Sequence, residues 1–144
     1  MRSLRRASTI VLVVLLLGAL LAPGALATQP DKQVPLKGDF VGVGVEFSGN
    51  FSHLGRFDGE VTFSAFPFAE ATWTAANGDT VTNESEIAID FMTGAYVQDI
   101  TITGGTGRFA DATGGATVTG TIDLGTGAYD GHLVGTISQP GPRS

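Results

Sequence analysis

The sequence predicts an all-β fold, a single domain built from seven or eight short antiparallel strands. Apolar and polar residues alternate along most of the chain, and no segment shows the roughly 3.6-residue period of an amphipathic helix. Turn signals recur about every ten residues, and connections this short join antiparallel neighbours. Glycine is abundant, with 21 residues in 144, which disfavours helix.

Two architectures fit this pattern, a β-sandwich and an up-and-down β-barrel. A barrel leaves no unpaired strand edges. It also needs bends where a side chain would clash, and glycines inside strands supply them. The predicted strands contain Gly42, Gly44, Gly120, Gly131 and Gly135. We therefore expect an eight-stranded antiparallel up-and-down β-barrel.

In the N-terminal half, the alternation is regular but the turn signals are weak. Gly49-Asn50, Asp58-Gly59 and Pro67 are the predicted connections, and residues 51–57 fit neither pattern. The predicted inward faces are Val41, Val43, Val45 and Phe47, then Val61, Phe63 and Ala65, then Ala69, Ala71, Trp73 and Ala75.

In the C-terminal half, the turns are clearer. Asn77-Gly78 is the strongest hairpin signal, because a type I′ turn needs positive φ at both central residues. Thr93-Gly94 and Gly125-Thr126-Gly127 predict two further turns. The predicted inward faces are Val81, Asn83, Ser85, Ile87, Ile89 and Phe91, then Tyr96, Gln98, Ile100 and Ile102, then Ala116, Val118, Ile122 and Leu124, then Tyr129, Leu133 and Ile137.

The N-terminus has the pattern of a secretory signal peptide over residues 1–27. Three arginines precede an apolar run, and Ala25-Leu26-Ala27 is a small-x-small cleavage site. The run is shorter than the roughly 20 residues of a transmembrane helix. We expect a secreted, extracellular protein with an exposed leader over 28–37, a barrel over 38–138 and a disordered tail over 139–144.

Composition narrows the possible partners. The signal removes three of the eight basic residues and none of the fourteen acids, so the formal net charge falls from −6 to −9. An acidic surface repels nucleic acid and anionic membranes, so we expect neither as a partner after signal cleavage. The chain has no Cys, so its core must stabilise it without disulfides.

The segment from Thr103 to Gly115 is rich in glycine around one Arg and one Phe. It contains a G-x-G-x-x-A match, but a strand follows instead of the helix that would hold a pyrophosphate. It also begins like a calcium-binding β-roll repeat, but the required Asp is replaced and only one copy exists. We predict a rigid corner between two strands, with the structural residues Gly104, Gly105, Gly107, Arg108, Phe109, Asp111 and Gly114.

Two Gly-Arg-Phe motifs contain Arg56 and Arg108. We expect each Arg to be held by a nearby carboxylate, Asp58 or Asp111, while each Phe closes an end of the core. The alternative is a pair of anion-binding arginines at one rim of the barrel.

The two histidines, His53 and His132, offer little for catalysis or metal binding. A zinc site needs three or four clustered ligands, and no G-x-S-x-G motif is present. We expect no metal and no cofactor. His53 is a candidate acid or base, because the ordinary pKa of histidine suits proton transfer. The alternative is a hydrogen-bonded histidine at a barrel end, and His132 falls on a polar face.

Several large or polar side chains fall on inward faces. Trp73, Tyr96 and Tyr129 are the candidate ligand-binding residues, and Asn83 and Gln98 share those faces. An eight-stranded barrel has room for its own side chains or for one small ligand. The alternative is plain core packing with the hydroxyls at the barrel ends. Asn50 and Asn83 each begin a glycosylation sequon.

Three motifs together carry a resemblance to a known family. His53-Leu54-Gly55-Arg56-Phe57, Ala76-Asn77-Gly78-Asp79 and the segment 104–114 resemble the hallmarks of small secreted bacterial proteins related to the allene oxide cyclase barrel. The last segment is also similar to a glycine-rich motif of plant dirigent proteins. The resemblance implies a calycin-like eight-stranded barrel with a central cavity, and it allows a trimer.

The resemblance implies less about activity. The enzymes and directing proteins of the family that the chain resembles handle apolar, cyclising substrates without a metal or organic cofactor. Plant cyclases use a Glu, a Cys and a Tyr inside the barrel, no motif here aligns with those residues, and Cys is absent. The resemblance therefore carries over the fold and not the activity. The leading expectation is a barrel that binds a small apolar ligand. The alternatives are a cofactor-free isomerase or cyclase, and a self-associating surface or matrix protein.

Overall fold

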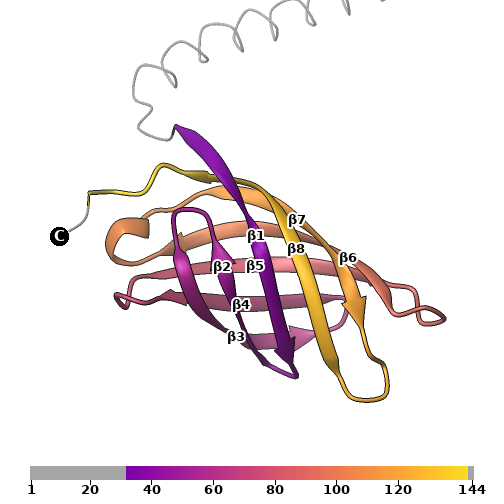
Figure 1. The fold of residues 1–144 in the computed structure, drawn as a ribbon. Helices are drawn as coiled ribbons and strands as arrows, with labels where there is room; N and C mark the ends of the chain where they lie inside the picture. Colours follow the sequence, from indigo (N-terminus) through magenta and orange to yellow (C-terminus); the bar gives the residue numbers. More distant parts are fainter. Residues whose placement is uncertain (1–31, 143–144) are drawn as a thin grey trace, which may run out of the picture. The chain divides into compact units, whose positions relative to one another are not determined.

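Eight strands pair in sequence order, and the last closes on the first (Figure 1). The computed structural model describes residues 32–142. The predicted signal peptide and residues 28–31 of the predicted leader lie outside the described residues. The strands are β1 (Gln33–Val43), β2 (Glu46–Phe51), β3 (Gly55–Ala65), β4 (Phe68–Ala75), β5 (Thr80–Ile89), β6 (Ala95–Gly105), β7 (Gly114–Ile122) and β8 (Ala128–Ser138). All neighbours are antiparallel, which confirms the predicted eight-stranded up-and-down barrel.

The first strand begins earlier than predicted. Residues 33–37, assigned to an exposed leader, belong to β1 and pair with β8. Pro35 suggested a loop because proline cannot donate to a strand ladder. Its position removes the conflict, since β2 pairs with β1 only from Gly38 onward. On the β2 side of β1, the missing N–H of Pro35 therefore faces no strand.

Inward and outward faces match the prediction from β4 to β8 and differ from it in β1. Val41 and Val43 are 61% exposed, whereas Leu36 and Phe40 are buried. The alternation in β1 was therefore assigned to the wrong face. Gly42 and Gly38, which alternate with the valines, lie on the inner face with Leu36 and Phe40.

The predicted inward face of β3 is also partly wrong, because this strand contains a bulge. Val61 pairs with Ala71 and Phe63 pairs with Glu70, so Thr62 is an extra residue in the ladder. Beyond an extra residue the two faces exchange. Phe63 is consequently exposed instead of buried, and the predicted inward face of β3 holds only as far as Val61.

Inward-facing glycines make room for aromatic rings from other strands. A Cβ atom at Gly131 would lie 2.6 Å from Cε1 of Phe40, and one at Gly59 would lie 2.6 Å from Cδ2 of Phe47. Gly49 and Gly59 were predicted to mark turns, but both lie within strands. The first turn is instead at Gly44-Val45, and the predicted turns at Asn77-Gly78, Thr93-Gly94 and 125–127 are confirmed.

One end of the barrel is closed by large side chains. The rings of Phe51 and Phe57 stack with centroids 4.2 Å apart, and Trp73 meets Phe51 edge-on at 5.1 Å. Phe109, in the short helix η1 (Gly107–Phe109), is buried at the same end. Truncating one such ring to Ala costs about 3–5 kcal/mol, so this cluster is a main source of stability.

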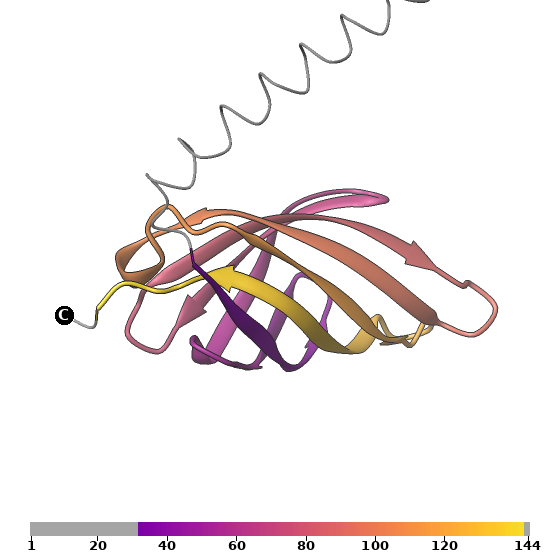
Figure 2. The ribbon, with the colours of Figure 1, turned by 90° about the horizontal axis from the view of Figure 1, so that it is seen from above.

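The chain end packs beside η1 and is described through residue 142 (Figure 2). The Gly141 N–H donates to the Arg108 carbonyl at 2.8 Å, and Arg108 Nε donates back to the Gly141 carbonyl at 3.3 Å. Gly141, within the predicted disordered tail over 139–144, therefore bonds to the glycine-rich corner, and the disorder of that tail stays a prediction. The last two residues lie outside the described range.

Candidate functional site

The interior of the barrel contains a cavity of about 300 Å³. Its lining runs from Trp73 and Asn83, deep in the barrel, to Val45 and Phe66 in the turns after β1 and β3. These turns lie at the end opposite the aromatic cluster, and we call this end the mouth. The cavity has the size of a small ligand pocket, at the lower end of the usual range of about 300–1,000 Å³.

The three predicted ligand-binding residues all line this cavity. Trp73 and Tyr96 are buried, and Tyr129 is partly buried. They project from β4, β6 and β8, so three separate parts of the wall contribute aromatic surface. Most other lining residues are Phe, Val, Ile, Leu or Ala. These faces therefore line a cavity, and ligand binding by the three residues stays a prediction.

A few uncharged polar groups break the apolar lining. Asn83 and Ser85 point inward from β5, and Gln98 points inward from the adjacent β6. Gln98 Nε2 donates to Ser85 Oγ at 2.8 Å, so these two side chains satisfy each other. Among the described lining residues there is no Asp, Glu, Lys, Arg or His. A buried charge on a ligand would find no counter-charge here.

Tyr96 is fixed by a short hydrogen bond. Its hydroxyl donates to the backbone carbonyl of Asp130 at 2.6 Å. Burial raises the Tyr96 pKa above its ordinary value, and the nearby charge of Asp130 raises it further. Burial also raises the pKa of Tyr129, whose hydroxyl donates to the Gly44 carbonyl at 3.0 Å. Both phenols therefore stay neutral at physiological pH and cannot act there as bases.

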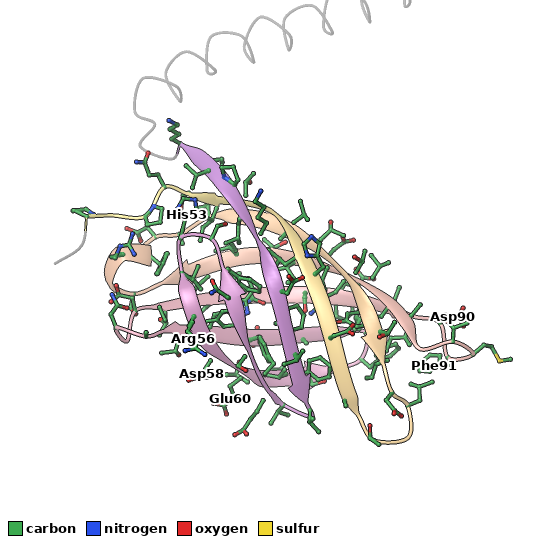
Figure 3. The ribbon with its side chains drawn as sticks, in the orientation of Figure 1. His53, Arg56, Asp58, Glu60, Asp90 and Phe91 are labelled. Atoms are coloured by element: carbon green, nitrogen blue, oxygen red, sulfur yellow. The ribbon has the colours of Figure 1, made fainter. Side chains whose placement is uncertain are left out.

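The mouth carries exposed apolar side chains on all four of its turns. Phe66 and Phe91 contact each other across two turns, with ring centroids 6.1 Å apart. Figure 3 shows Phe91 and Asp90 on the β5–β6 turn, at the opposite end of the barrel from His53. Exposed apolar patches are typical of interaction sites. The remaining mouth residues of this kind are Val45, Met92 and Leu124.

The candidate acid or base, His53, lies outside the cavity. It is an exposed residue of the β2–β3 turn at the closed end, with φ of 69°. This part of the chain turns instead of continuing as the extended strand that would have placed His53 beside Phe51. His132 is exposed on β8, as predicted, and its Nδ1 lies 2.7 Å from Oδ1 of Asp39. Neither histidine can reach a molecule in the lumen.

The glycine-rich segment forms a corner between β6 and β7, but other groups hold it than those predicted. Among residues 32–142, neither Arg108 with Asp111 nor Arg56 with Asp58 forms an ion pair. Arg108 donates instead to backbone carbonyls, and its own N–H donates to Oδ2 of Asp79. The alternative of two anion-binding arginines is not supported, because Arg56 lies on the outer wall of β3 (Figure 3).

The corner glycines serve close packing. Gly107 has φ of +60°, which favours glycine, and the Asp79 carboxylate lies where a side chain would be. Gly105 packs against backbone atoms of Thr80 and Phe109, and Gly114 packs against Thr136. Gly104 borders the irregularity where β5 and β6 change register.

Burial and spacing bear on two other signals of the sequence, the glycosylation sequons and the possible metal ligands. Asn83 is buried, so its sequon is not accessible for glycosylation in the folded barrel, whereas Asn50 is exposed. Within residues 32–142, no three His, Asp or Glu side chains cluster as metal ligands. The same residues contain no helix long and apolar enough to cross a membrane.

Sequence reasoning missed the aromatic side chains of the mouth. Phe66 and Phe68 flank the Pro67 connection and line the cavity entrance, although the prediction treated this segment only as a turn. Phe91 was assigned to the interior but is exposed. The available signal was the concentration of phenylalanine at predicted turns, where polar residues are usual.

Comparisons with protein-family models, with curated proteins and with solved structures found no match.

Proposed function

We propose that the barrel binds a small apolar ligand in its lumen, as an extracellular protein. The observation that carries the proposal is the cavity of about 300 Å³, lined mainly by aromatic and aliphatic side chains. Such a cavity binds ligands chiefly by removing apolar surface from water, which contributes about 25 cal/mol per Å². The exposed apolar side chains at the mouth give the ligand an apolar route inward.

A fluorescent apolar probe tests this proposal directly. Trp73 is the only tryptophan in the chain and lines the cavity. The neutral probe N-phenylnaphthylamine, bound in the lumen, is expected to quench Trp73 emission and to raise the melting temperature. The absence of both effects across a broad set of neutral apolar compounds would reject ligand binding.

A matched pair of variants locates the binding. Ala71 lines the cavity, whereas Thr72, the next residue of β4, does not. Ala71→Phe fills the lumen and is expected to abolish probe binding, and Thr72→Phe is expected to leave it unchanged. If both variants lose probe binding equally, or if neither loses it, the probe binds outside the lumen. Circular dichroism checks that both variants remain folded.

A cofactor-free isomerase or cyclase, as in the allene oxide cyclase resemblance, is the second candidate. It requires a group in the lumen that can move a proton or polarise a substrate. Tyr96 is the candidate, but its hydroxyl already donates to the Asp130 carbonyl, and its raised pKa disfavours the phenolate. The lumen offers hydrogen bonds and shape more than acid–base chemistry, so binding is the better-supported function.

Self-association as a surface or matrix protein is the third candidate. The exposed Phe66 and Phe91 at the mouth favour it, because contiguous apolar side chains often meet a second copy. Sedimentation at increasing protein concentration separates this candidate from ligand binding. A monomer at all concentrations would reject it, while leaving ligand binding in place.

A further inference from the structure

Asn83 is a buried polar side chain whose amide donor has no partner. The residue is 4% exposed and lines the cavity from β5. Its Nδ2 atom has no hydrogen-bond partner among residues 32–142. A buried donor that forms no hydrogen bond destabilises a fold, and native proteins seldom leave one. Such a group inside a cavity is therefore positioned to bind something that enters it.

The neighbouring polar side chains do not supply the missing bond. Ser85, the next inward residue of β5, already accepts from Gln98. Directly across the ladder, Asn83 faces Ala71 on β4 and Ile102 on β6, which have apolar side chains. The donor of Asn83 thus has no hydrogen-bond acceptor among the described residues, and a hydrogen bond from it to a ligand would discriminate strongly between acceptors and non-acceptors.

The depth of Asn83 defines how the ligand would lie. Ile89 lines the cavity near the mouth and Val81, beyond Asn83, is fully buried at the closed end. Asn83 and Ile89 are six residues apart on one strand, or about 20 Å along it. A ligand that reaches Asn83 therefore brings its oxygen in first and leaves its apolar body in the outer lumen.

We propose that Asn83 donates a hydrogen bond to an uncharged oxygen, a ketone, aldehyde or ester carbonyl or an ether, at the leading end of an otherwise apolar ligand. This inference rests on the ligand-binding function proposed above and specifies its chemical class. The ligand is neutral, because no cationic side chain among the described lining residues could pair with a carboxylate.

The test uses three ligands with one shape. Acetylnaphthalene carries the carbonyl, isopropylnaphthalene replaces its oxygen with a methyl group, and naphthoate carries a charge. Each Kd is measured by NMR titration for the wild type and for Asn83→Leu, which keeps the side-chain volume and removes the amide. The ratio of the ketone Kd to the hydrocarbon Kd is expected to rise about tenfold in the variant.

A second readout follows the amide itself. The Asn83 side-chain NH₂ resonances, identified by their loss in Asn83→Leu, are expected to shift with the ketone and much less with the hydrocarbon. Naphthoate is expected to bind more weakly to the wild type than the ketone does. The wild-type data alone can reject the proposal, so it stays testable even if the variant folds poorly.

The outcomes separate the two proposals. If the hydrocarbon and ketone both bind but the ratio is unchanged and the Asn83 resonances stay in place, the role of Asn83 is wrong and lumen binding stands. If naphthoate binds best, the neutral class is wrong. If no naphthalene binds and N-phenylnaphthylamine also fails, the ligand-binding function itself is wrong.

Discussion

Oδ2 of Asp79 accepts a hydrogen bond from the backbone N–H of Arg108 at 3.2 Å, which ties the β4–β5 turn to the glycine-rich corner. The same oxygen accepts from Nδ2 of Asn77 at 2.9 Å, and the N–H of Asp79 donates to Oδ1 of Asn77 at 3.0 Å. One carboxylate is therefore shared between two loops of the closed end, and it adds to the hydrogen bonds between Thr80 and Thr106 that join the same region.

Replacement of this carboxylate by an amide is expected to destabilise the barrel. Asp79→Asn keeps the size of the side chain but weakens its hydrogen bonds, since bonds to a charged acceptor are stronger. We expect the free energy of unfolding to fall by about 1 kcal/mol, measured by urea denaturation. The matched control is Asp111→Asn, because Asp111 forms no ion pair among the described residues. An equal loss in the control would favour the original assignment of Asp111 as the residue that holds the corner.

A methyl group at Gly131 is expected to strain the lumen. The added Cβ atom would lie 2.6 Å from Cε1 of Phe40 and 2.8 Å from the Tyr96 hydroxyl, so the rings must move. Gly131→Ala should lower the free energy of unfolding by about 1–3 kcal/mol. Gly125→Ala is the control, because its Cβ atom would meet only a turn carboxylate, at 3.3 Å. A neutral result at Gly131 would show that the rings relax freely.

The stability of the barrel is expected to decline at alkaline pH. Tyr96 and Tyr129, the only tyrosines, have pKa values raised from the ordinary value of 10.0 by burial. The folded state then holds these protons more tightly than the unfolded state does. Their contribution is fully present below pH 10 and is lost as the pH rises through the folded pKa values.

Phenolate absorbance checks this directly. In the native protein, both tyrosines should ionise above pH 10. In denaturant, they should ionise near pH 10. Tyr96→Phe should reduce the alkaline loss of stability, because its shift is the larger one. Native titration near pH 10 would contradict the burial of both hydroxyls.

The mouth is expected to control entry to the lumen. Phe91→Ser removes an exposed ring that contacts Phe66 at the entrance. We expect slower association of N-phenylnaphthylamine, measured by stopped-flow quenching of Trp73. Phe63→Ser is the control, because Phe63 is similarly exposed (52% against 63%) but lies on the outer wall of β3. Equal slowing in both variants would mean that the effect is one of general surface hydrophobicity.

The fold class could be predicted from the sequence because period and turn spacing are local properties. From β4 onward, Asn77-Gly78, Thr93-Gly94 and 125–127 fix the register, and the inward faces within the strands were assigned correctly, whereas Phe91 and Leu124, in the turns that follow β5 and β7, are exposed. In β1 to β3, glycine has two structural roles that the local sequence does not distinguish. Gly44 makes a turn, whereas Gly49 packs closely against the backbone of β1 and Gly59 makes space for the ring of Phe47.

The candidate site was predictable only in part, for the same physical reason. The faces of Trp73, Tyr96 and Tyr129 follow from alternation, so their place in the lumen could be inferred. The exposure of His53 depends on a turn with positive φ, and the outward position of Phe63 depends on a bulge. Neither the turn nor the bulge is marked by a clear local sequence signal, and the space beside Asn83 depends on side chains from several strands.

Both ends of the described chain leave the barrel at its closed end, where β1 begins beside the end of β8 (Figure 1). Any attachment made at the ends of the described residues 32–142, whether a tag, a solid support or a neighbouring domain, would therefore be at the closed end of the barrel. A molecule tethered in this way points its mouth away from the tether. The chain can thus be immobilised for binding measurements, or fused to another protein, without obstructing the entrance to the lumen.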